Sequence, residues 1–485
     1  MAAVAEHLSV TPSLEEAKRL AGEHNLIPVR HSFIEDCETP VSAFLKLRGD
    51  GPAFLLESAE QGQRVGRWSF IGWRPRRVLR WSLADGGDPY TLAGDAVSEN
   101  RQAEIDGLPP FAGGAVGFFG FDCVRAVERL PEPNPDVLGL PDMALMLSDV
   151  VVAFDHLKHT VTILANAYLD DHTDIEAAHA RAVEAIRDTR ARLAGPLPAP
   201  VVHEPREAPR FESNMPREQF ESMVSRIVEY IHAGDAYQVV PSQRWSAPAP
   251  VEPFSIYRGL RAVNPSPYMY FLDFEDFQIV GASPEPLLTV SGSHVSTRPI
   301  AGTRPRGDDD AAIAADLLAD EKERAEHVML VDLGRNDLGR VCEHGSVHVE
   351  RLMEVETYSH VVHIVSQVAG TLREDVGAID ALRSVLPAGT LSGAPKIRAL
   401  EIIDELEPVK RGAYGGAVGW LSYGGELDTC ICIRTVVVKD GVAHIQAGGG
   451  TVADAQPEYE FEESRAKARG VVMAIELATD QAGWP

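Results

Sequence analysis

Apolar and polar residues along the first half of the chain follow patterns typical of strands. Buried or alternating runs predict strands at residues 53–59, 68–81, 113–121 and 144–166, the last with a turn near 156–159. Ser13 and Glu16 form a capping box that opens a short helix, which ends near Gly22. A longer helix is expected at about 173–193 and closes this half.

The second half combines helical and strand periodicity. Apolar residues between 220 and 231 recur at helical spacing, and Gly234 ends that helix. Further helices are predicted at about 309–338, 379–386, 396–406 and 458–477, and further strands at 237–240, 268–274, 277–280, 287–290, 417–421, 429–438 and 442–447. Because strands and helices are grouped in blocks, the pattern favours an α+β fold over a doubly wound sheet.

A proline-rich stretch separates the two halves. Gly195 begins it, and prolines then follow at 196, 198, 200, 205 and 209, which prevents a helix or a central strand from continuing. We therefore expect an N-terminal region at 1–195, a connector at 196–210 and a C-terminal region at 211–485.

Composition indicates a globular protein that does not bind nucleic acid. The 485 residues include 45 Lys and Arg against 72 Asp and Glu, a net charge of −27, which repels nucleic acid and anionic membranes. A small anionic substrate would need a local group of cations or a metal. No apolar run reaches the length of a membrane span, and residues 1–20 lack the features of a secretory signal, so we expect a cytoplasmic protein. The five cysteines lack zinc-site spacing and are expected to be reduced.

Two pairs of glutamates have the spacing of one helical face. Glu323 and Glu326 form one pair, and Glu460 and Glu463 form the other. Two such helices facing each other would offer carboxylates to a hard cation such as Mg²⁺. The alternative is a solvated charged surface, which a helical ion pair between Glu463 and Lys467 would favour.

Several segments could bind an anion. Gly448, Gly449 and Gly450 follow a predicted strand and could direct backbone N–H groups at a carboxylate, although an ordinary turn would have the same residues. Residues 302–307 (GTRPRG) combine a hydroxyl with two guanidinium groups. Arg434 falls within the predicted apolar strand and needs an anionic partner, either a ligand or a structural carboxylate.

Two titratable residues are candidates for proton transfer. Glu285 stands between Pro284 and Pro286, whose apolar surroundings could raise its pKa toward use as a general acid. His363 lies in the apolar run 361–365. Each also has a structural alternative, because Glu285 could lie on a surface loop and His363 could be a hydrogen-bonded core residue.

The order and wording of these segments closely resemble the chorismate-utilising enzymes, and within them the anthranilate synthase branch. The resemblance is dense from about residue 214 to 474. It rests on the motifs GDAYQVVPSQR at 234–244, ASPE at 282–285, RPIAGTRPRG at 298–307, EHVMLVDLGRND at 326–337, GTLSGAPK at 389–396, GGAVG at 415–419 and LDTCICIR at 427–434.

The resemblance implies a fold and a reaction. The fold would be a two-layer arrangement of large antiparallel β-sheets with helices on the outside. The reaction would add ammonia to chorismate, a dianion with an enolpyruvyl ether, and then eliminate pyruvate to give anthranilate. This is the first step of tryptophan biosynthesis.

The resemblance also implies roles for individual residues. Mg²⁺ would be bound by Glu326 and Glu463, with Glu323 and Glu460 in support. Glu285 would be the general acid for the departing hydroxyl, and His363 would handle a proton in the elimination. The implied substrate contacts are Gly302, Thr303, Tyr414, Arg434, Gly448, Gly449 and Gly450, with Thr303 and Gln238 also placed among the catalytic residues.

Two positions distinguish this chain from other branches of the family. Isochorismate and salicylate synthases have a lysine that activates water where this chain has Gln238, and glutamine cannot act as that base. Many aminodeoxychorismate synthases have a nucleophilic lysine where this chain has Ala301. An aminodeoxychorismate synthase without that lysine, and a catalytically silent tryptophan-binding regulator, are the two alternatives.

Partners and regulation follow from the same resemblance. None of the cysteines lies in a glutaminase-type turn, so ammonia would come from a separate glutaminase subunit, component II, in a heterotetramer of two large and two small subunits. Tryptophan would act as a feedback inhibitor, and its site would include Ser58, Pro267, Tyr268 and Met269, with Glu57 near its amino group.

Overall fold

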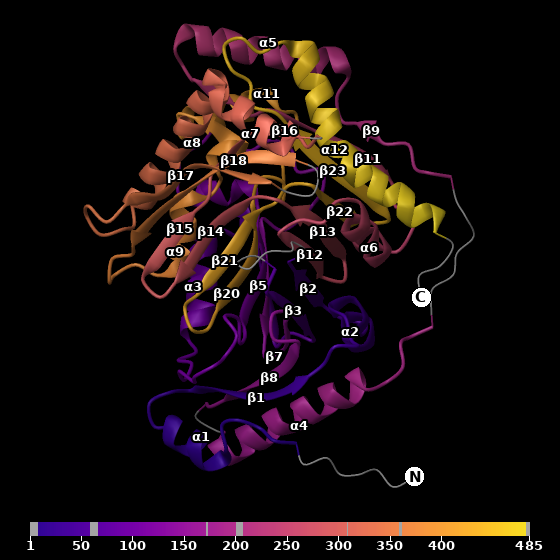
Figure 1. The fold of residues 1–485 in the computed structure, drawn as a ribbon, viewed down its shortest axis with the longest axis vertical. Coiled ribbons are helices and arrows are strands. Elements are labelled where there is room, and N and C mark those ends of the chain that lie inside the picture. Colours follow the sequence, from indigo (N-terminus) through magenta and orange to yellow (C-terminus); the bar gives the residue numbers. More distant parts are fainter. Residues whose placement is uncertain are drawn as a thin grey trace.

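Two large antiparallel sheets form the centre of the fold (Figure 1). The computed structural model describes residues 8–58, 66–170, 173–199, 207–307, 309–357 and 361–481, except for the side chains of 303, 305 and 361. The first sheet contains, in spatial order, β1 (Leu26–Ile34), β8 (Thr160–Tyr168), β7 (Val150–Asp155), β3 (Trp68–Trp73), β2 (Ala53–Glu57), β12 (Tyr268–Asp273), β13 (Phe277–Ser283), β22 (Thr435–Lys439), β23 (Val442–Gly448), β11 (Ser242–Pro248) and β9 (Glu212–Ser213).

The second sheet packs against the first. Its strands are, in order, β16 (Ile300–Pro305), β18 (Val361–Thr371), β15 (His294–Thr297), β14 (Pro286–Ser291), β21 (Leu427–Ile431), β20 (Ala417–Ser422), β5 (Gly114–Phe119), β6 (Met143–Ser148) and β4 (Arg77–Trp81), and β17 (His348–Thr357) pairs with β18. A short separate ladder joins β10 (Gln238–Val239) and β19 (Gly393–Ala394).

Helices cover the outer faces of both sheets. They are α1 (Leu14–Leu20), α2 (Pro40–Leu47), α3 (Pro89–Ser98), α4 (Ile175–Leu193), α5 (Arg217–Ala233), α6 (Pro253–Val263), α7 (Asp310–Ala319), α8 (Glu321–Gly339), α9 (Ala378–Val385), α10 (Gly389–Ser392), α11 (Lys396–Leu406) and α12 (Pro457–Asp480), with 3₁₀ turns η1 (Leu83–Asp85) and η2 (Phe121–Ala126). Figure 1 shows α4 against β8 at one end of the molecule and α5 at the other. Within the described ranges, every helix is too short or too polar to cross a membrane.

Period-two alternation in the strands explains the layers. In β2, Phe54 faces an aromatic core shared by both sheets, whereas Leu55 faces the helices outside the first sheet. Phe118 of β5 and Tyr270 of β12 meet in the shared core. A third apolar cluster lies between the second sheet and helices that include α3 and α9. This is the predicted α+β arrangement of antiparallel sheets with helices outside, and the prediction is confirmed.

Several predicted strands are in fact two strands in different sheets, so the sequence interpretation was wrong there. Residues 68–81 form β3 and β4, and residues 429–438 form parts of β21 and β22. Each pair is separated by an arginine in the left-handed region, Arg74 at φ 51° and Arg434 at φ 49°. Arg434 therefore lies between strands and not within one. At Arg434 the apolar pattern continues through the break, because the flanking Cys432 and Thr435 are buried. At 74–77 the break falls on a polar Arg-Pro-Arg-Arg stretch that is exposed or half-buried.

The long helix predicted at 309–338 is also divided, into α7 and α8. Asp320 ends the first helix and caps the second, where its carboxylate accepts hydrogen bonds from the N–H groups of Lys322 and Glu323. By contrast, the helix at α5 ends at Gly234 as predicted, with φ at 89°. The capping box of Ser13 and Glu16 is also present.

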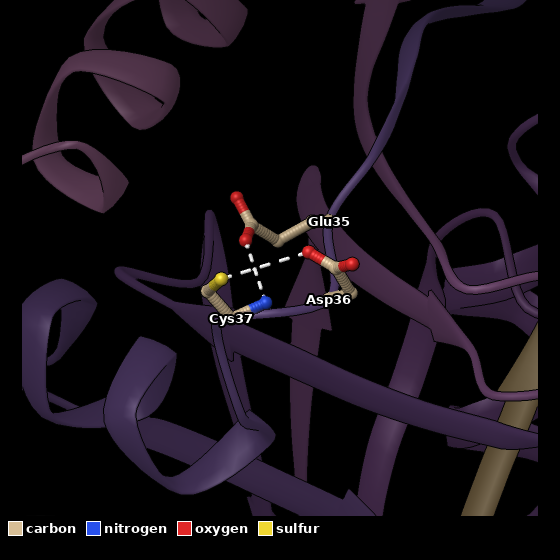
Figure 2. Close-up of side chains that lie close together, drawn as sticks. All are labelled: Glu35, Asp36 and Cys37. Atoms are coloured by element: carbon tan, nitrogen blue, oxygen red, sulfur yellow. Dashed lines mark hydrogen bonds between the residues drawn. The ribbon is translucent and has the colours of Figure 1, made fainter.

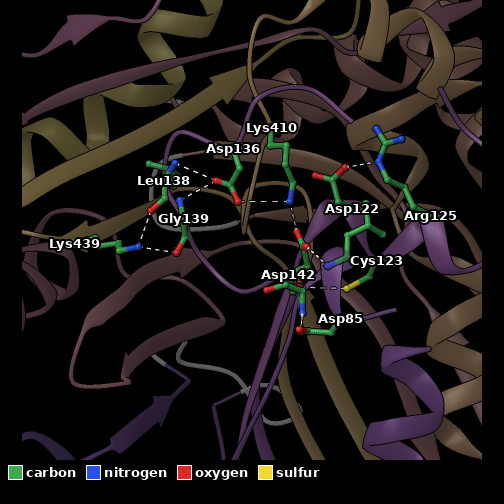
Figure 3. A network of polar contacts seen from close by, with 12 residues as sticks. Asp85, Asp122, Cys123, Arg125, Asp136, Leu138, Gly139, Asp142, Lys410 and Lys439 are labelled. Carbon is green, nitrogen blue, oxygen red and sulfur yellow. Dashed lines mark hydrogen bonds and ion pairs between the residues drawn. The ribbon is translucent and has the colours of Figure 1, made fainter. Parts of the chain in front are cut away.

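Strands from before and after the connector share both large sheets. Residues 200–206 of the connector lie outside the described part of the chain. A buried polar network adds to the link between the halves (Figure 3). In it, Lys410 Nζ lies 2.8 Å from Asp142 Oδ1 and 3.6 Å from Asp136 Oδ2. Lys439 donates to the carbonyls of Leu138 and Gly139. These contacts fix the N-terminal strands to the segments that carry the site.

Candidate active site

Two crossings between the sheets bring Glu285 and Arg434 together. Glu285 lies between β13 of the first sheet and β14 of the second, and Arg434 lies between β21 and β22. The Ile431 N–H donates to the Glu285 carbonyl at 3.0 Å, and the Ala282 N–H donates to the Arg434 carbonyl at 3.2 Å. These backbone bonds hold the two crossings side by side, with a carboxyl and a guanidinium within electrostatic range.

The Glu285 carboxyl lies in surroundings that favour its protonated form. Burial raises the pKa of Glu285 to about 7. A hydrogen bond from Thr390 Oγ1 to Glu285 Oε1, at 2.9 Å, and the charges of Lys467 and Arg434 oppose this rise. Glu285 therefore changes its protonation state near neutral pH, which suits a general acid.

The predicted glutamates on α8 and α12 come together. Burial has the largest effect on the pKa of Glu326 and raises it. The negative charges of Glu323 and Glu463 raise this pKa further, which shows that both lie close to Glu326. Gln238 Nε2 donates to Glu326 Oε1 at 3.1 Å. Burial, followed by the charge of Glu463, raises the pKa of Glu460 to about 7. Only 6% of Glu460 is exposed, which rules out a solvated surface for this residue.

The glycine segment after β23 lies directly against these carboxylates. A Cβ added to Gly449 would lie 2.9 Å from Glu460 Oε2 and 3.3 Å from Glu463 Oε2. A Cβ added to Gly450 would lie 2.4 Å from Gln238 Nε2. The lack of side chains therefore allows the backbone to approach the acidic group closely.

His363 and Gly302 occupy neighbouring strands of the second sheet. His363 Nδ1 lies 3.1 Å from the Gly302 carbonyl and donates to it, because that oxygen only accepts. Burial lowers the pKa of His363, so its ring is neutral near pH 7. A Cβ added to Gly302 would lie 3.1 Å from Glu323 Oε2. Gly302 of β16 therefore lies next to the Glu323 carboxylate of α8. Thr303 pairs with His363 in the ladder, but its side chain lies outside the described part of the structure.

Tyr414 lies close to the crossing that carries Glu285. Its side chain is buried, with the Arg411 guanidinium 5.6 Å from its ring centroid. Its phenol is close enough to Glu285 for the two to interact electrostatically. The predicted substrate contacts thus come from four parts of the chain and meet around Glu285 and the glutamates: β16, the segment before β20, the crossing at Arg434 and the end of β23 with the residues after it.

The carboxylates fit a Mg²⁺ ion. Mg²⁺ usually binds one or two protein carboxylates and completes its shell with water and substrate oxygens. Glu460 Oε2 is buried without a hydrogen-bond partner, so it is an available ligand. Among the described residues, only the exposed group Glu35, Asp36 and Cys37 brings three potential ligand atoms within 4.8 Å of one another (Figure 2). No three of the four glutamates, all of which lie in the described ranges, bring carboxylate oxygens within 4.8 Å of one another, so they are spaced more widely than this group.

Two residues of this site were not assigned a role from the sequence. The sequence indicates Lys467 only as the helical ion-pair partner of Glu463, to which it is paired at 3.0 Å. Its Nζ also donates to the Gly448 carbonyl at 3.1 Å, and its charge acts on Glu285 and Glu326. Thr390 stands in the motif at 389–396, but no spacing rule connects it to Glu285, 105 residues earlier.

A cavity of about 340 Å³ lies between the two sheets, apart from the glutamates. All four residues predicted to bind tryptophan line it: Ser58, Pro267, Tyr268 and Met269. Ser58 Oγ is buried and has no hydrogen-bond partner. Glu57 also lines the cavity, but its carboxylate accepts a hydrogen bond from Tyr257 and pairs with Arg261 at 3.3 Å. Pro284 and Pro286, on either side of Glu285, form part of the wall.

The adjacent glycines Gly448 and Gly449 are expected to respond differently to alanine. A Cβ at Gly448 would lie 2.0 Å from the Pro241 carbonyl oxygen, a backbone atom that cannot easily move, so Gly448→Ala should lower the free energy of unfolding by at least about 1–3 kcal/mol. At Gly449 the nearest atom is the flexible end of the Glu460 side chain, which can move away. The free energy of unfolding of Gly449→Ala should therefore lie within about 0.5 kcal/mol of that of the unsubstituted chain. Urea unfolding of both variants measures this. Equal losses would contradict the close approach at Gly448.

Comparisons with known proteins show the family of the chain. The family described as chorismate binding enzyme matches residues 51–473. Anthranilate synthase component 1 of Pseudomonas putida is 49% identical, over 96% of this chain and 98% of its own length. The crystal structure of anthranilate synthase component I from Streptococcus pneumoniae has a TM-score of 0.76 at 37% identity, covering 91% of this chain and 99% of that one. The menaquinone-specific isochorismate synthase of Escherichia coli shares the fold, with a TM-score of 0.69 at 19% identity, covering 95% of this chain and 98% of that one.

The chain therefore belongs to the family of chorismate-binding enzymes. Its curated relatives of nearly equal length carry the name anthranilate synthase component 1, and the predicted resemblance to that branch is confirmed.

Proposed function

We propose that this chain is the chorismate-aminating large subunit of an anthranilate synthase. It would convert chorismate and ammonia into anthranilate, pyruvate and water. The near full-length similarity to relatives named anthranilate synthase component 1 is the observation that carries the proposal. The test is to incubate the purified chain with chorismate, Mg²⁺ and ammonium and to identify the product by fluorescence and mass. If the product is aminodeoxychorismate, the chain is an aminodeoxychorismate synthase subunit instead.

Cations held close to the site support binding of a dianion by a protein with a net charge of −27. Arg434 is largely buried beside Glu285, and Lys467 lies between Glu463 and the Gly448 carbonyl. The backbone amides of Gly449 and Gly450 add hydrogen-bond donors without further charge. These groups would hold the two carboxylates of chorismate against the repulsion of the rest of the protein.

The acidic group supports a role for Mg²⁺ as cofactor. Glu326 and Glu463 would hold the ion directly, with Glu323 and Glu460 in support. When bound, Mg²⁺ would neutralise the ring carboxylate of the substrate. Gln238, which donates to Glu326, would keep that carboxylate oriented and would provide no base to activate water.

Glu285 and His363 support the two proton transfers. Because burial raises its pKa to about 7, Glu285 can donate a proton to the departing hydroxyl as ammonia adds to the ring. The His363 ring is neutral and donates through Nδ1, which places the lone pair on Nε2. That nitrogen can accept the ring proton that is lost when pyruvate leaves and the ring becomes aromatic.

The cysteines support an external source of ammonia. Four of the five are buried. The exposed Cys37 lies beside the carboxylate of Asp36, with its Sγ 3.6 Å from Oδ1 (Figure 2). Asp36 raises the pKa of the Cys37 thiol, which makes it a poor nucleophile at neutral pH. A separate glutaminase subunit would therefore supply the ammonia. The tetramer of two large and two small subunits and the cytoplasmic location stay predictions.

The cavity between the sheets supports a site for tryptophan as a feedback inhibitor. Its volume of about 340 Å³ is within the usual range for small-molecule sites. Tyr268, Met269 and Pro267 offer apolar surface for an indole ring, and the unpaired Ser58 Oγ offers a hydrogen-bonding group. Glu57 already has partners in Tyr257 and Arg261, so its part in amine binding would be indirect.

Ser58→Ala should weaken tryptophan inhibition by about 5–10-fold, the usual contribution of one hydrogen bond of about 1–1.5 kcal/mol. The rate without tryptophan should stay within about two-fold, because Ser58 lies in the cavity and not among the glutamates. The measurement is the inhibition constant in the chorismate assay. Ser291→Ala, which makes the same change at an exposed end of β14, is the control. Undiminished inhibition of Ser58→Ala would place the inhibitor elsewhere.

A further inference from the structure

Arg298 belongs to the wall of the cavity and also contacts β17, which pairs with the strand that carries His363. It lies just before β16, and its Nη2 donates to Glu356 Oε1 at 2.5 Å and Oε2 at 2.6 Å. Its Nε is buried and has no hydrogen-bond partner. In a guanidinium group, Nε and a neighbouring Nη form one edge that can bind a carboxylate with two hydrogen bonds. In Arg298 only half of that edge is used.

Glu356 connects Arg298 to the catalytic centre. Glu356 of β17 lies directly opposite His363 of β18 in the antiparallel ladder. Residues that face each other in this way project from the same side of the sheet, so the two side chains are neighbours. The charge of Glu356 raises the pKa of His363, which is consistent with that proximity. Arg351 lies 3.7 Å from the same carboxylate, so Arg298 is its closer cation.

We propose that Arg298 is a positioning residue for His363, acting through Glu356, and that an amino acid in the cavity inhibits the enzyme by binding Arg298 through its carboxylate. This inference rests on the proposed function. A ligand carboxylate that binds Nε of Arg298 also reaches Nη2 on the same edge of the guanidinium, and there it competes with the Glu356 carboxylate. When the ligand displaces Glu356 from Arg298, the Glu356 side chain is no longer held in place. His363, which lies opposite Glu356 in the ladder, then loses a neighbour of fixed position. The ligand class is an aromatic amino acid with a free carboxylate, because the wall also includes aromatic side chains and prolines that can pack against a ring, among them Trp68, Tyr268 and Pro267.

This arrangement satisfies the thermodynamic requirement for inhibition at a distance. A ligand changes activity only if it binds the active and inactive arrangements with different affinities. Arg298 provides that difference, because it cannot present the same edge fully to Glu356 and to the ligand. The unpaired Ser58 Oγ and Arg298 Nε are both buried polar atoms of the cavity lining that a bound amino acid would satisfy.

The test compares Glu356→Gln, Arg298→Gln and the double variant of the full chain, assayed with chorismate, Mg²⁺ and ammonium. Tryptophan is the probe, and its Kd is measured by titration separately from inhibition. Glu356→Gln should lower kcat about 10-fold with KM for chorismate within about two-fold, and should still bind tryptophan with a Kd within about three-fold. Saturating tryptophan should then remove less than half of the remaining activity.

Arg298→Gln should lower kcat to a similar extent and raise the Kd of tryptophan by about 10-fold or more, because the guanidinium edge is lost. The double variant should have a kcat no lower than that of Glu356→Gln alone, because Arg298 acts through Glu356. Glu354→Gln, the same change two residues earlier on β17 at a half-exposed position, is the control and should leave kcat and inhibition unchanged.

Two results would overturn the inference while the proposed function stands. They are full inhibition of Glu356→Gln by tryptophan, and kcat losses that multiply in the double variant. An unsubstituted chain that makes no anthranilate, or that tryptophan does not inhibit, overturns the proposed function itself and this inference with it.

Discussion

Glu326→Gln is expected to reduce anthranilate formation by about 10²-fold or more while the chain remains folded. The substitution keeps the shape of the side chain, and its amide oxygen can still accept from Gln238. It removes a carboxylate that would hold Mg²⁺, so the concentration of Mg²⁺ needed for half-maximal rate should also rise. Initial rates over a Mg²⁺ titration measure both effects.

The same change should leave stability unchanged or increase it. Glu323 and Glu463 raise the pKa of Glu326 by repulsion, and a neutral amide relieves that repulsion when no metal is present. Thermal unfolding without Mg²⁺ is the measurement. Glu321→Gln, at an exposed position on the same helix, is the control and should keep full activity. An active Glu326→Gln enzyme with an unchanged Mg²⁺ requirement would refute the metal assignment.

Glu285→Gln is expected to lower kcat by about 10²–10⁴-fold, the usual contribution of a general acid. The unsubstituted enzyme should also lose activity as the pH rises through about 7, because Glu285 then loses the proton that it donates. The profile is measured at a constant concentration of free ammonia, since ammonia itself becomes more abundant with pH. A rate that does not fall above pH 7 under these conditions would rule out Glu285 as the acid.

Thr390→Val distinguishes Glu285 from Glu460, whose pKa is also raised to about 7. The Thr390 hydroxyl donates to Glu285 and lowers its pKa, whereas no contact joins it to Glu460 in the described residues. Removing this hydrogen bond should raise the pKa of Glu285, so the loss of activity at alkaline pH in the pH–rate profile should move to higher pH. If that loss of activity occurs at the same pH in Thr390→Val, a group other than Glu285 causes it.

Sequence reasoning succeeded where local pattern and local structure agree. The helix α5 has a clear apolar stripe and a glycine at its end, and both features depend only on neighbouring residues. It failed where the chain crosses between sheets. At Arg434 the flanking residues Cys432 and Thr435 are buried, so the apolar pattern there contains no sign of the change of sheet. The crossing after Arg74 does carry a sign, because residues 74–77 are Arg-Pro-Arg-Arg and are exposed or half-buried, and the predicted strand at 68–81 runs through it.

Other misses have a different physical cause. The strand β17 alternates between half-buried and exposed residues, with no fully buried position, because it lies at the edge of its sheet, and no strand was predicted there. Lys467 resembles a surface partner of Glu463 in sequence, and only the fold places it against the Gly448 carbonyl. The contact of Thr390 with Glu285 depends on how α10 packs. The motif residues of the candidate site were identified because they stand in recognisable order, but their distances required the structure.

The measurement that tests the central claim most directly is the rate of anthranilate formation from chorismate and ammonia as Mg²⁺ is removed with a chelator and then restored. If carboxylates from α8 and α12 hold the ion that binds chorismate for amination, the rate should fall to background and return, with equal amounts of anthranilate and pyruvate. A full rate without divalent cations, or a product other than anthranilate, would contradict the account.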